Sequence, residues 1–372
     1  MMHRNALEAV DKTLKFLMDD SDKIFGGKTV LLGGDFRQVL PVIRGGTRAD
    51  IVSASINRSR LWSHCQVFKL TINMRIRNKD ADTVELQKIK EFGKWVLDLG
   101  DGKLPTTSTK EGEEPTWIKI PEDLLIPSLH DPIQQIVNNT FPNMQQSLED
   151  MNYLNSRCIL SPNNEFVDEV NSYIVSTIQS ETRTYFSVDS ISPTSEAIEN
   201  QDILFPVELL NSLKIFGFPN HELELRVGVP IMLLRNYNQS MGLCNGTRLI
   251  VTKLAAWIIE AKIITGNNIG KNVLIYRIIM ETTDTKWPFK LRMKQFPIKV
   301  CFAMTINKSQ GQTLEHVGVY FPKTVFSHGQ LYVAVSRTTS CEGLKFLIVN
   351  KEGEQEGYTQ NILYQEAFNN FP

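Results

Sequence analysis

Asp35 and Gln38 follow a short apolar run and could act on a phosphate group. Residues 28–33 read Lys-Thr-Val-Leu-Leu-Gly, which predicts a buried strand of a parallel sheet. The carboxyl ends of such strands are where open α/β sheets bind ligands. The amide of Gln38 can donate to a γ-phosphate oxygen and accept from a water molecule, so it could report whether a nucleotide carries that phosphate. Taken alone, these residues also fit a turn with a satisfied amide.

Two arginines have side chains of a kind that could offset negative charge on a phosphate group. Arg75 ends the segment Leu-Thr-Ile-Asn-Met-Arg at 70–75. Arg337 ends the segment 328–337, which mixes polar and apolar residues. A planar guanidinium that is always charged matches a phosphoryl group better than an ammonium does. Residues 327–337 are predicted to form a helix with Gln330 and Arg337 on one face. Taken alone, Arg75 is better explained as a surface ion pair.

Polar side chains crowd the point where a predicted strand gives way to a predicted helix. The strand covers residues 297–304, and the helix follows Ile306. Hydroxyls, amides, a lysine and the free N–H groups of a helix start together suit nucleic-acid phosphates and a nucleotide. A helix cap would need one polar residue, not six. The polar cluster consists of Thr305, Asn307, Lys308, Ser309, Gln310 and Gln312, with Gly311 among them.

Residues 286–299 combine positive charge with aromatic rings. Five lysines and arginines, with no acidic residue, alternate with Trp287, Phe289 and Phe296. Cations that contact the backbone and rings that stack under bases are the two features of sequence-tolerant single-strand binding. An edge strand with a solvated basic face explains the same pattern about equally well.

The segment Gly26-Gly27-Lys28-Thr29 resembles the end of a nucleotide-binding phosphate loop. The motif requires a glycine where the chain has Asp22, and it requires a helix directly after the Gly-Lys-Thr triplet. Here the triplet leads into the predicted strand, so no helix amino terminus is available to a phosphate. The sequence therefore predicts a structural turn.

Periodicity predicts the elements that would position these residues. Apolar spacing predicts amphipathic helices at 5–20, with Asn5 as N-cap, and at 82–100, and the Gly- and Thr-rich stretch 101–116 reads as an exposed loop. From about 205 to 295, short β-branched runs alternate with Gly/Asn turns, which predicts a small β-barrel. Further elements are expected as follows: strands at 157–160, 229–234, 247–252, 257–264, 272–280, 316–321 and 344–349, and a helix that buries Val167, Val170, Ile174 and Ile178.

Composition narrows the class of protein. A chain of 372 residues predicts two or more packed units, and its hydrophobic fraction of 42% and charged fraction of 22% are ordinary for a soluble protein. Five scattered cysteines without a C-x-x-C pair argue against a disulfide framework and a zinc site, and they suggest a reducing compartment. The net charge is −1, so nucleic-acid binding would require a local basic surface. No targeting signal is readable, and no apolar run is long enough to span a membrane.

Four segments together resemble motifs III, IV, V and VI of PIF-type helicases, a P-loop family of superfamily one that includes the helicase part of helitron transposons. The resemblance covers nearly the whole chain. The segments are 25–42, with its Gly-Asp-x-x-Gln-x-x-Pro core, 70–75, 302–313 and 328–337; the stretches 159–164 and 227–248 add support.

The resemblance implies an α/β fold made of two RecA-like P-loop helicase domains, the first one incomplete, with a small SH3-like β-barrel insert. It implies that residues 1–145 are a partial first domain with motifs III and IV. Residues 146–204 and 296–372 would form the second domain, with motifs V and VI, and residues 205–295 the insert.

The resemblance also implies an ATP-dependent DNA helicase of 5′-to-3′ polarity that acts in DNA repair, recombination or telomere maintenance. ATP and Mg²⁺ are the implied cofactors, and single-stranded DNA and DNA junctions are the implied partners. The compartment is expected to be the nucleus, with the mitochondrion as the alternative, and the oligomeric state is left open. Residues carried over by motif are, for the nucleotide, Asp35, Gln38, Arg75, Gly311 and Arg337, of which Gln38, Arg75 and Arg337 would be catalytic; and, for DNA, Thr305, Asn307, Lys308, Ser309 and Trp287.

The sequence departs from the family pattern at its beginning. The family places a phosphate-binding loop and an Asp-Glu pair before the helix with which this chain starts, and neither is found in these residues. We therefore expect an amino-terminally truncated chain that is inactive alone, because MgATP loses its main holders. A non-catalytic single-stranded-DNA-binding remnant and a transposon-derived helicase fragment are the alternatives.

Overall fold

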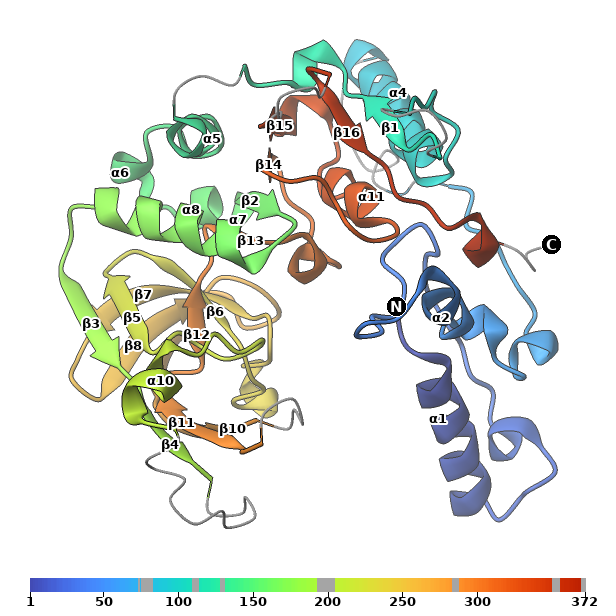
Figure 1. Cartoon of the computed structure of the whole chain (residues 1–372), viewed down its shortest axis with the longest axis horizontal. Helices are drawn as coiled ribbons and strands as arrows, with labels where there is room; N and C mark the ends of the chain where they lie inside the picture. The colour runs from blue at the N-terminus through green and yellow to red at the C-terminus, as the bar shows by residue number, and fades with distance from the viewer. Residues whose placement is uncertain are drawn as a thin grey trace. The chain divides into compact units, whose positions relative to one another are not determined.

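The computed structural model describes residues 1–72, 74, 83–108, 114–127, 131–192, 205–282, 288–349 and 355–368. The chain divides into two compact units (Figure 1). The first unit comprises 1–132, 160–162 and 305–372, and the second comprises 133–159 and 163–304. In the part of the chain that is described, every helix is too short or too polar to cross a bilayer. The domain boundaries expected at 145, 204 and 295 stay a prediction.

The first helix forms as predicted but begins earlier and is less buried. Helix α1 spans Arg4–Leu17, and its N-cap is His3, whose ring accepts a hydrogen bond from the backbone N–H of Asn5 at 3.0 Å. Asn5 itself was the predicted cap, and it lies inside the helix instead. Leu7 packs with Phe25 and Leu61, whereas the last turn of the helix leaves its apolar side chains exposed. Of the apolar side chains on this helix, Leu7 and Leu14 therefore contribute to the core, whereas Val10 and Leu17 are exposed.

The strand predicted at 28–33 is not formed. These residues carry no strand assignment, and the side chain of Leu31 is 93% exposed. A strand of a parallel sheet exists through hydrogen bonds to neighbouring strands, and none of the described strands pairs with this segment. An apolar run alone is therefore not enough to predict a strand at these residues.

The turn predicted at Gly26–Gly27 is present. Residues Ile24–Gly27 form the 3₁₀ turn η1, in which Phe25 and Gly26 have φ of 52° and 59°. Gly26 approaches α1 so closely that an added Cβ would lie 2.6 Å from the carbonyl oxygen of Leu14. In the described residues no helix begins directly after the triplet, so the phosphate-loop interpretation has no structural basis here.

The remaining elements of the first unit include a helix and a parallel strand pair that the sequence predicted. Helix α4, Thr83–Gly100, confirms the predicted helix and its end, and it buries Ile89 and Leu99. Strands β14 and β15 pair in parallel, as expected for an α/β unit, with Val319 opposite Phe346. In full, the elements are α2 (Arg48–Ser53), η2 (Ile56–Arg58), η3 (Trp62–His64), β1 (Trp117–Lys119), η4 (Glu122–Leu124), η6 (Ile306–Ser309), β14 (His316–Phe321), α11 (Gln330–Val335), η7 (Cys341–Gly343), β15 (Leu344–Ile348), β16 (Tyr358–Gln360) and η8 (Gln365–Phe368). Strands β1 and β16 pair antiparallel, and the described parts of 101–116 are largely exposed, as predicted.

The second unit combines helices with short antiparallel sheets (Figure 1). The strand predicted at 157–160 and the helix after it are confirmed as β2 and α8. The elements are α5 (Pro132–Thr140), α6 (Met144–Ser147), α7 (Met151–Ser156), β2 (Arg157–Ser161), α8 (Asn164–Thr177), β3 (Thr182–Phe186), β4 (Val188–Ile191), α10 (Val207–Ser212), β5 (Glu222–Arg226), β6 (Pro230–Leu233), η5 (Gln239–Met241), β7 (Arg248–Leu254), β8 (Ile258–Ile263), β9 (Asn272–Tyr276), β10 (Ile278–Glu281), β11 (Leu291–Gln295), β12 (Ile298–Val300) and β13 (Ala303–Thr305).

The expected β-barrel is an open sheet. Five strands pair in the order β12-β6-β7-β8-β9, and in the described residues the two outer strands do not pair with each other. The run 272–280 was predicted as one strand, but it breaks at Arg277 into β9 and β10, which belong to different sheets. A closed barrel needs a continuous ladder around its circumference, and this break directs the chain into a separate sheet, β10-β11-β4.

The strand predicted at 297–304 is likewise divided, because Asn171 of α8 holds the chain at the break. Its amide nitrogen donates to the carbonyl oxygens of Val300 and Ala303 at 3.2 and 3.0 Å, and its amide oxygen accepts from the N–H of Ala303 at 2.9 Å. The backbone groups that would continue the ladder are thus satisfied by a side chain. This fixes the segment that leads into Thr305.

Candidate functional site

The loop that carries Asp35 and Gln38 is a tight turn held by its own polar groups. The N–H of Gln38 donates to the carbonyl oxygen of Asp35 at 3.2 Å, and the N–H of Arg37 donates to the Asp35 carboxylate at 3.0 Å. The Arg37 guanidinium then contacts Asp101, with Nε 2.5 Å from Oδ1. These hydrogen bonds are those of a turn. The turn places Gln38 next to Gln310, which is distant in sequence.

Helix α11 and the residues before it pack directly on this loop. The hydroxyl of Tyr332 donates to Oδ2 of Asp35 at 2.8 Å, so both oxygens of this carboxylate are engaged by the protein. Burial, together with the neighbouring Asp35 carboxylate, raises the pKa of Tyr332, which keeps its hydroxyl protonated and donating. Gly329, with φ of 71°, touches the backbone of Arg37 and Gln38. Motif III and motif VI segments are therefore one packed assembly.

His328 ties the loop to the carboxyl-terminal segment. Its Nδ1 accepts from the backbone N–H of Tyr364 at 2.8 Å, so the ring proton resides on Nε2, which donates to the carbonyl oxygen of Phe36 at 2.8 Å. Burial lowers the pKa of His328, assisted by Arg48 and opposed by the Phe36 hydrogen bond and by the carboxylates of Asp35 and Glu366. The neutral ring is therefore the form that fits.

We expect the free energy of unfolding to fall as the pH is lowered below the ordinary histidine pKa. The unfolded imidazole titrates near ~6.5, whereas the folded ring resists protonation, so the contribution of His328 is complete above that value and is lost below it. Urea unfolding at a series of pH values would measure the slope. The His328→Gln variant, which cannot titrate, should show a shallower slope; an identical slope would contradict the assignment.

Gln38 is paired with Gln310 of the polar cluster. The amide nitrogen of Gln310 donates to Oε1 of Gln38 at 2.7 Å. In the described residues the NH₂ group of Gln38 has no hydrogen-bond partner, and the side chain is partly exposed. An oriented amide with an available donor can bind a phosphate oxygen.

The helix predicted at the polar cluster that contains Gln310 is shorter than expected. The helix expected after Ile306 is the single 3₁₀ turn η6, and Gly311, with φ of 85°, follows it in an open position. No extended helix therefore presents a fan of N–H groups. Asn307 is exposed, whereas the hydroxyl of Ser309 is fully buried and donates to Ile306 at 2.7 Å, so Ser309 stabilises the turn itself. The assigned contacts of Thr305, Asn307, Lys308 and Ser309 with DNA stay predictions.

Arg337 is buried against the same turn. Its guanidinium donates to the carbonyl oxygens of Ser309 and Gln312 at 3.2 and 3.0 Å, and its Nε donates to Val333 at 2.8 Å. Helix α11 ends at Val335, so the predicted helix 327–337 is too long at both ends and Arg337 does not share a helical face with Gln330. Gln330 contacts Asn307 instead, at 3.4 Å. Arg337 thus joins motif VI to motif V.

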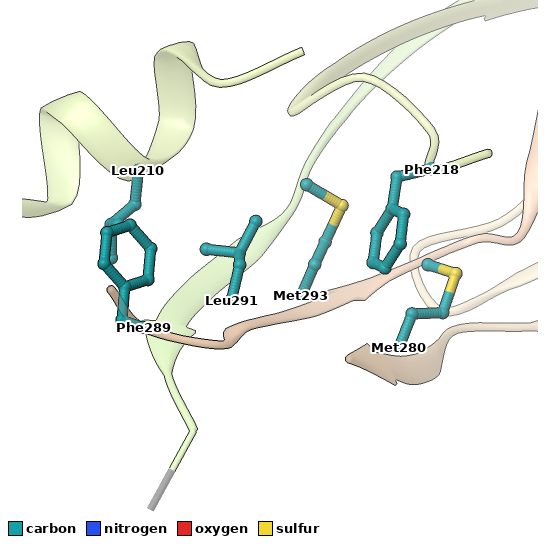
Figure 2. Close-up of a cluster of buried hydrophobic side chains, with 6 residues drawn as sticks. All are labelled: Leu210, Phe218, Met280, Phe289, Leu291 and Met293. Carbon is teal, nitrogen blue, oxygen red and sulfur yellow. The ribbon is translucent and has the colours of Figure 1, made fainter. Parts of the chain in front are cut away.

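The basic and aromatic segment is built differently from the prediction. Strand β11 lies between β10 and β4 and is not an edge strand. Phe289 and Phe296 are 3% and 0% exposed, so neither ring is available to a base. Figure 2 shows Phe289 within an apolar cluster between α10 and strands β10 and β11. The cluster also contains Leu210, Phe218, Met280, Leu291 and Met293.

Two of the predicted site residues, Arg75 and Trp287, lie outside the described residues. The described candidates Asp35, Gln38, Gly311 and Arg337 are all in the first unit. Tyr332 and His328 lie within the segment 328–337, but no role for either follows from the sequence.

Asp101, which anchors Arg37, follows α4 and is marked by no pattern. A tyrosine inside a mostly apolar helix and a histidine just before it would have been the signal for Tyr332 and His328, because buried polar groups need partners. No comparable signal exists for Asp101, because its partner is distant in sequence.

Comparison with known proteins finds similar sequences. Residues 1–110 match the family model for PIF1-like helicase, and residues 208–254 match that for the 2B domain of DNA helicase Pif1. The ATP-dependent DNA helicase PIF1 of Xenopus laevis is 25% identical over 351 residues, which are 92% of this chain and 44% of the relative. The chain thus spans less than half the length of that protein.

Solved structures extend the likeness to the fold. The Pif1 helicase from Candida albicans superposes with a TM-score of 0.57 at 22% identity, covering 95% of this chain and 72% of that one. The Pif1 helicase from Bacteroides, in complex with ADP-AlF₃ and ssDNA, gives a TM-score of 0.59 at 19% identity, covering 97% and 75%. The RecA-like α/β helicase fold expected from the sequence is therefore confirmed. Over most of its length the chain is similar to PIF1-like helicases.

Proposed function

We propose that this chain supplies the γ-phosphate-sensing and DNA-contacting parts of an ATP-dependent DNA helicase. One observation carries the proposal: a single hydrogen-bonded cluster joins the Gln38 loop, the turn at 305–312 and Arg337. A change at a phosphate bound by Gln38 would be transmitted through Gln310 to residues suited to a DNA strand. Coupling of this kind is how hydrolysis can drive movement.

The cluster fits a phosphate better than it fits a metal ion. Gln38 offers a donor, and Arg337 offers positive charge once it exchanges a backbone carbonyl for a phosphate oxygen. Asp35 is a carboxylate of the same loop as Gln38, but its two oxygens are occupied by Arg37 and Tyr332. The described residues contain no group of three metal ligands. We propose ATP and Mg²⁺ as cofactors, with their remaining binding groups outside this cluster. The 372 residues alone are therefore not expected to hydrolyse ATP.

The activity is best tested in a replacement chimera. In the Xenopus laevis relative, the matched part would be replaced by this chain while the rest of that protein is kept. We propose 5′-to-3′ polarity, so the chimera should unwind a fork with a 5′ single-stranded tail and leave a fork with only a 3′ tail intact. Unwinding of the 3′-tailed fork alone would contradict the polarity. DNA binding without ATP turnover would instead support the non-catalytic alternative.

The cellular setting follows from the same proposal. We propose a nuclear role in DNA repair, recombination or telomere maintenance, with DNA junctions among the substrates. A DNA-gripping role for the open sheet of the second unit, of the kind expected for an SH3-like insert, belongs to this proposal as well.

We expect the chain itself to bind single-stranded DNA weakly and with a steep dependence on salt. Phosphate contacts release counterions, so Lys308→Ala should reduce the slope of log affinity against log salt by roughly 0.7, the single-strand value for one contact. Fluorescence anisotropy over a salt titration measures this slope. Lys12→Ala, at an exposed position of α1 in the same unit, is the matched control and should leave the slope unchanged. An unchanged slope for Lys308→Ala would remove the turn from the DNA track.

A further inference from the structure

Three arginines of the first unit border a pocket that the proposed nucleotide site does not use. Arg4 is the first residue of α1, Arg48 is the first of α2, and Arg58 is the last of η2. They line a pocket of about 550 Å³, within the size range of small-molecule sites. Side chains from α2, among them Val52, form an apolar part of its wall.

The guanidinium groups are anchored by groups of the protein. Arg4 donates from one nitrogen to the carbonyl oxygen of Arg58 at 3.3 Å, and Arg58 donates from one nitrogen to the carbonyl oxygen of Glu366 at 3.0 Å. Arg48 lies over the ring of Tyr364, 5.0 Å from its centroid. Long side chains held in this way lose less entropy when a ligand binds.

Positive charge in the pocket exceeds negative charge. Glu366 is its acidic lining residue, and Glu366 pairs with Arg48 at 2.9 Å, as does Glu114 at 3.1 Å. In the described structure no carboxylate lies within ion-pair distance of Arg4 or Arg58. A guanidinium has five N–H donors, and each of these two has one protein acceptor, so donors remain for a ligand with several oxygens.

We propose that this pocket binds a phosphate group, carried either by a nucleic-acid strand or by a small phosphate compound. Tetrahedral phosphate oxygens accept from more than one guanidinium at once, and arginine is the residue best suited to such bidentate contacts. The partly buried position of the three side chains reduces screening by water and strengthens the attraction. Glu366 lowers the affinity of the pocket for phosphate, because its carboxylate competes for the same cations.

The test uses pyrophosphate and an oligothymidylate as probes of the full chain, by isothermal titration. Arg4→Gln and Arg58→Gln should each weaken pyrophosphate binding by roughly tenfold, the loss of one charge-assisted contact. Lys12→Gln, the same charge change on the exposed side of α1, should have little effect. Glu366→Gln keeps an acceptor for Arg48 but removes the competing charge, so it should strengthen binding several-fold, an effect that a merely unfolded variant cannot produce.

The two probes distinguish a nucleic-acid phosphate from the phosphate of a small compound. They also allow this pocket to be tested separately from the proposed helicase function. Loss of both pyrophosphate and oligothymidylate binding in the Arg4 and Arg58 variants assigns the pocket to a nucleic-acid strand; loss of pyrophosphate alone assigns it to a small compound. Lys308→Ala tests the helicase track independently, so either idea can fail while the other stands. Unchanged pyrophosphate affinity in a variant that combines Arg4→Gln with Arg58→Gln, an equal loss in Lys12→Gln, or equally tight binding of a hexaglutamate peptide would overturn the proposal.

Discussion

Arg337→Ala is expected to lower the ATP turnover of the chimera by roughly 10³-fold, the effect of removing an arginine that stabilises the charge of a transferring phosphoryl group. In this structure the Arg337 guanidinium already spans the turn at 305–312 through the carbonyls of Ser309 and Gln312. Its removal therefore takes away both the charge and the link between the two motifs. Such a residue acts on the transition state, so nucleotide affinity should change much less than turnover.

Two further measurements separate the charge from the link. Arg337→Lys retains a cation but not the planar fork, so it should recover part of the phosphate effect while still leaving carbonyls of the turn without donors. Thermal unfolding of the variants reports the structural part. Equal losses in nucleotide affinity and turnover would assign Arg337 to ground-state binding, and wild-type turnover in Arg337→Ala would remove it from the site.

Gly329→Ala is expected to separate the Gln38 loop from α11 and to lower the free energy of unfolding by about 3 kcal/mol or more, the sum of left-handed backbone strain and overpacking. Gly329 has φ of 71°, and an added Cβ would lie inside van der Waals contact of the Arg37 carbonyl oxygen and 2.8 Å from the carbonyl carbon of Gln38. Because the obstruction is backbone, no side-chain rotation relieves it. The hydrogen bonds from Tyr332 and His328 to the loop should be lost with this contact.

A matched control isolates the clash from the strain. Gly270 has φ of 87° with no atom within 4 Å of an added Cβ, so Gly270→Ala should cost only the left-handed term, about 1–2 kcal/mol. Urea unfolding of both variants measures the difference, and turnover of the chimera should fall with Gly329→Ala alone. Equal destabilisation by the two substitutions would show that the loop and helix are not in the contact described here.

Elements with strong local patterns were predictable from the sequence. The helix at 82–100 and the strand at 316–321 combine apolar periodicity with clear ends, and both appear where expected, as α4 and β14. The failures have tertiary causes. Residues 28–33 have the composition of a buried strand, but a strand requires partners, and composition does not reveal whether they are present. Residues 297–304 are divided by the side chain of Asn171, which lies more than a hundred positions away.

The candidate site was predictable in its residue types but not in its bonding. The motifs identified Gln38 and Gln310 near the ends of predicted strands and Arg337 at the end of a predicted helix, and the structure brings all three together. The partners of Asp35 could not be derived, because its carboxylate is held by Tyr332 from a distant helix. The aromatic residues of 286–299 illustrate the opposite error, since rings that suit base stacking also suit a core, as Phe289 does.

ATP hydrolysis by the chimera, measured with and without single-stranded DNA, tests the central claim most directly. The claim is that one cluster couples a γ-phosphate to a DNA strand. It predicts that DNA accelerates hydrolysis by roughly tenfold or more, which corresponds to about 1.4 kcal/mol off the barrier, and that Arg337→Ala abolishes this acceleration. Hydrolysis that proceeds at the same rate with and without DNA, or that is indifferent to Arg337→Ala, would contradict it.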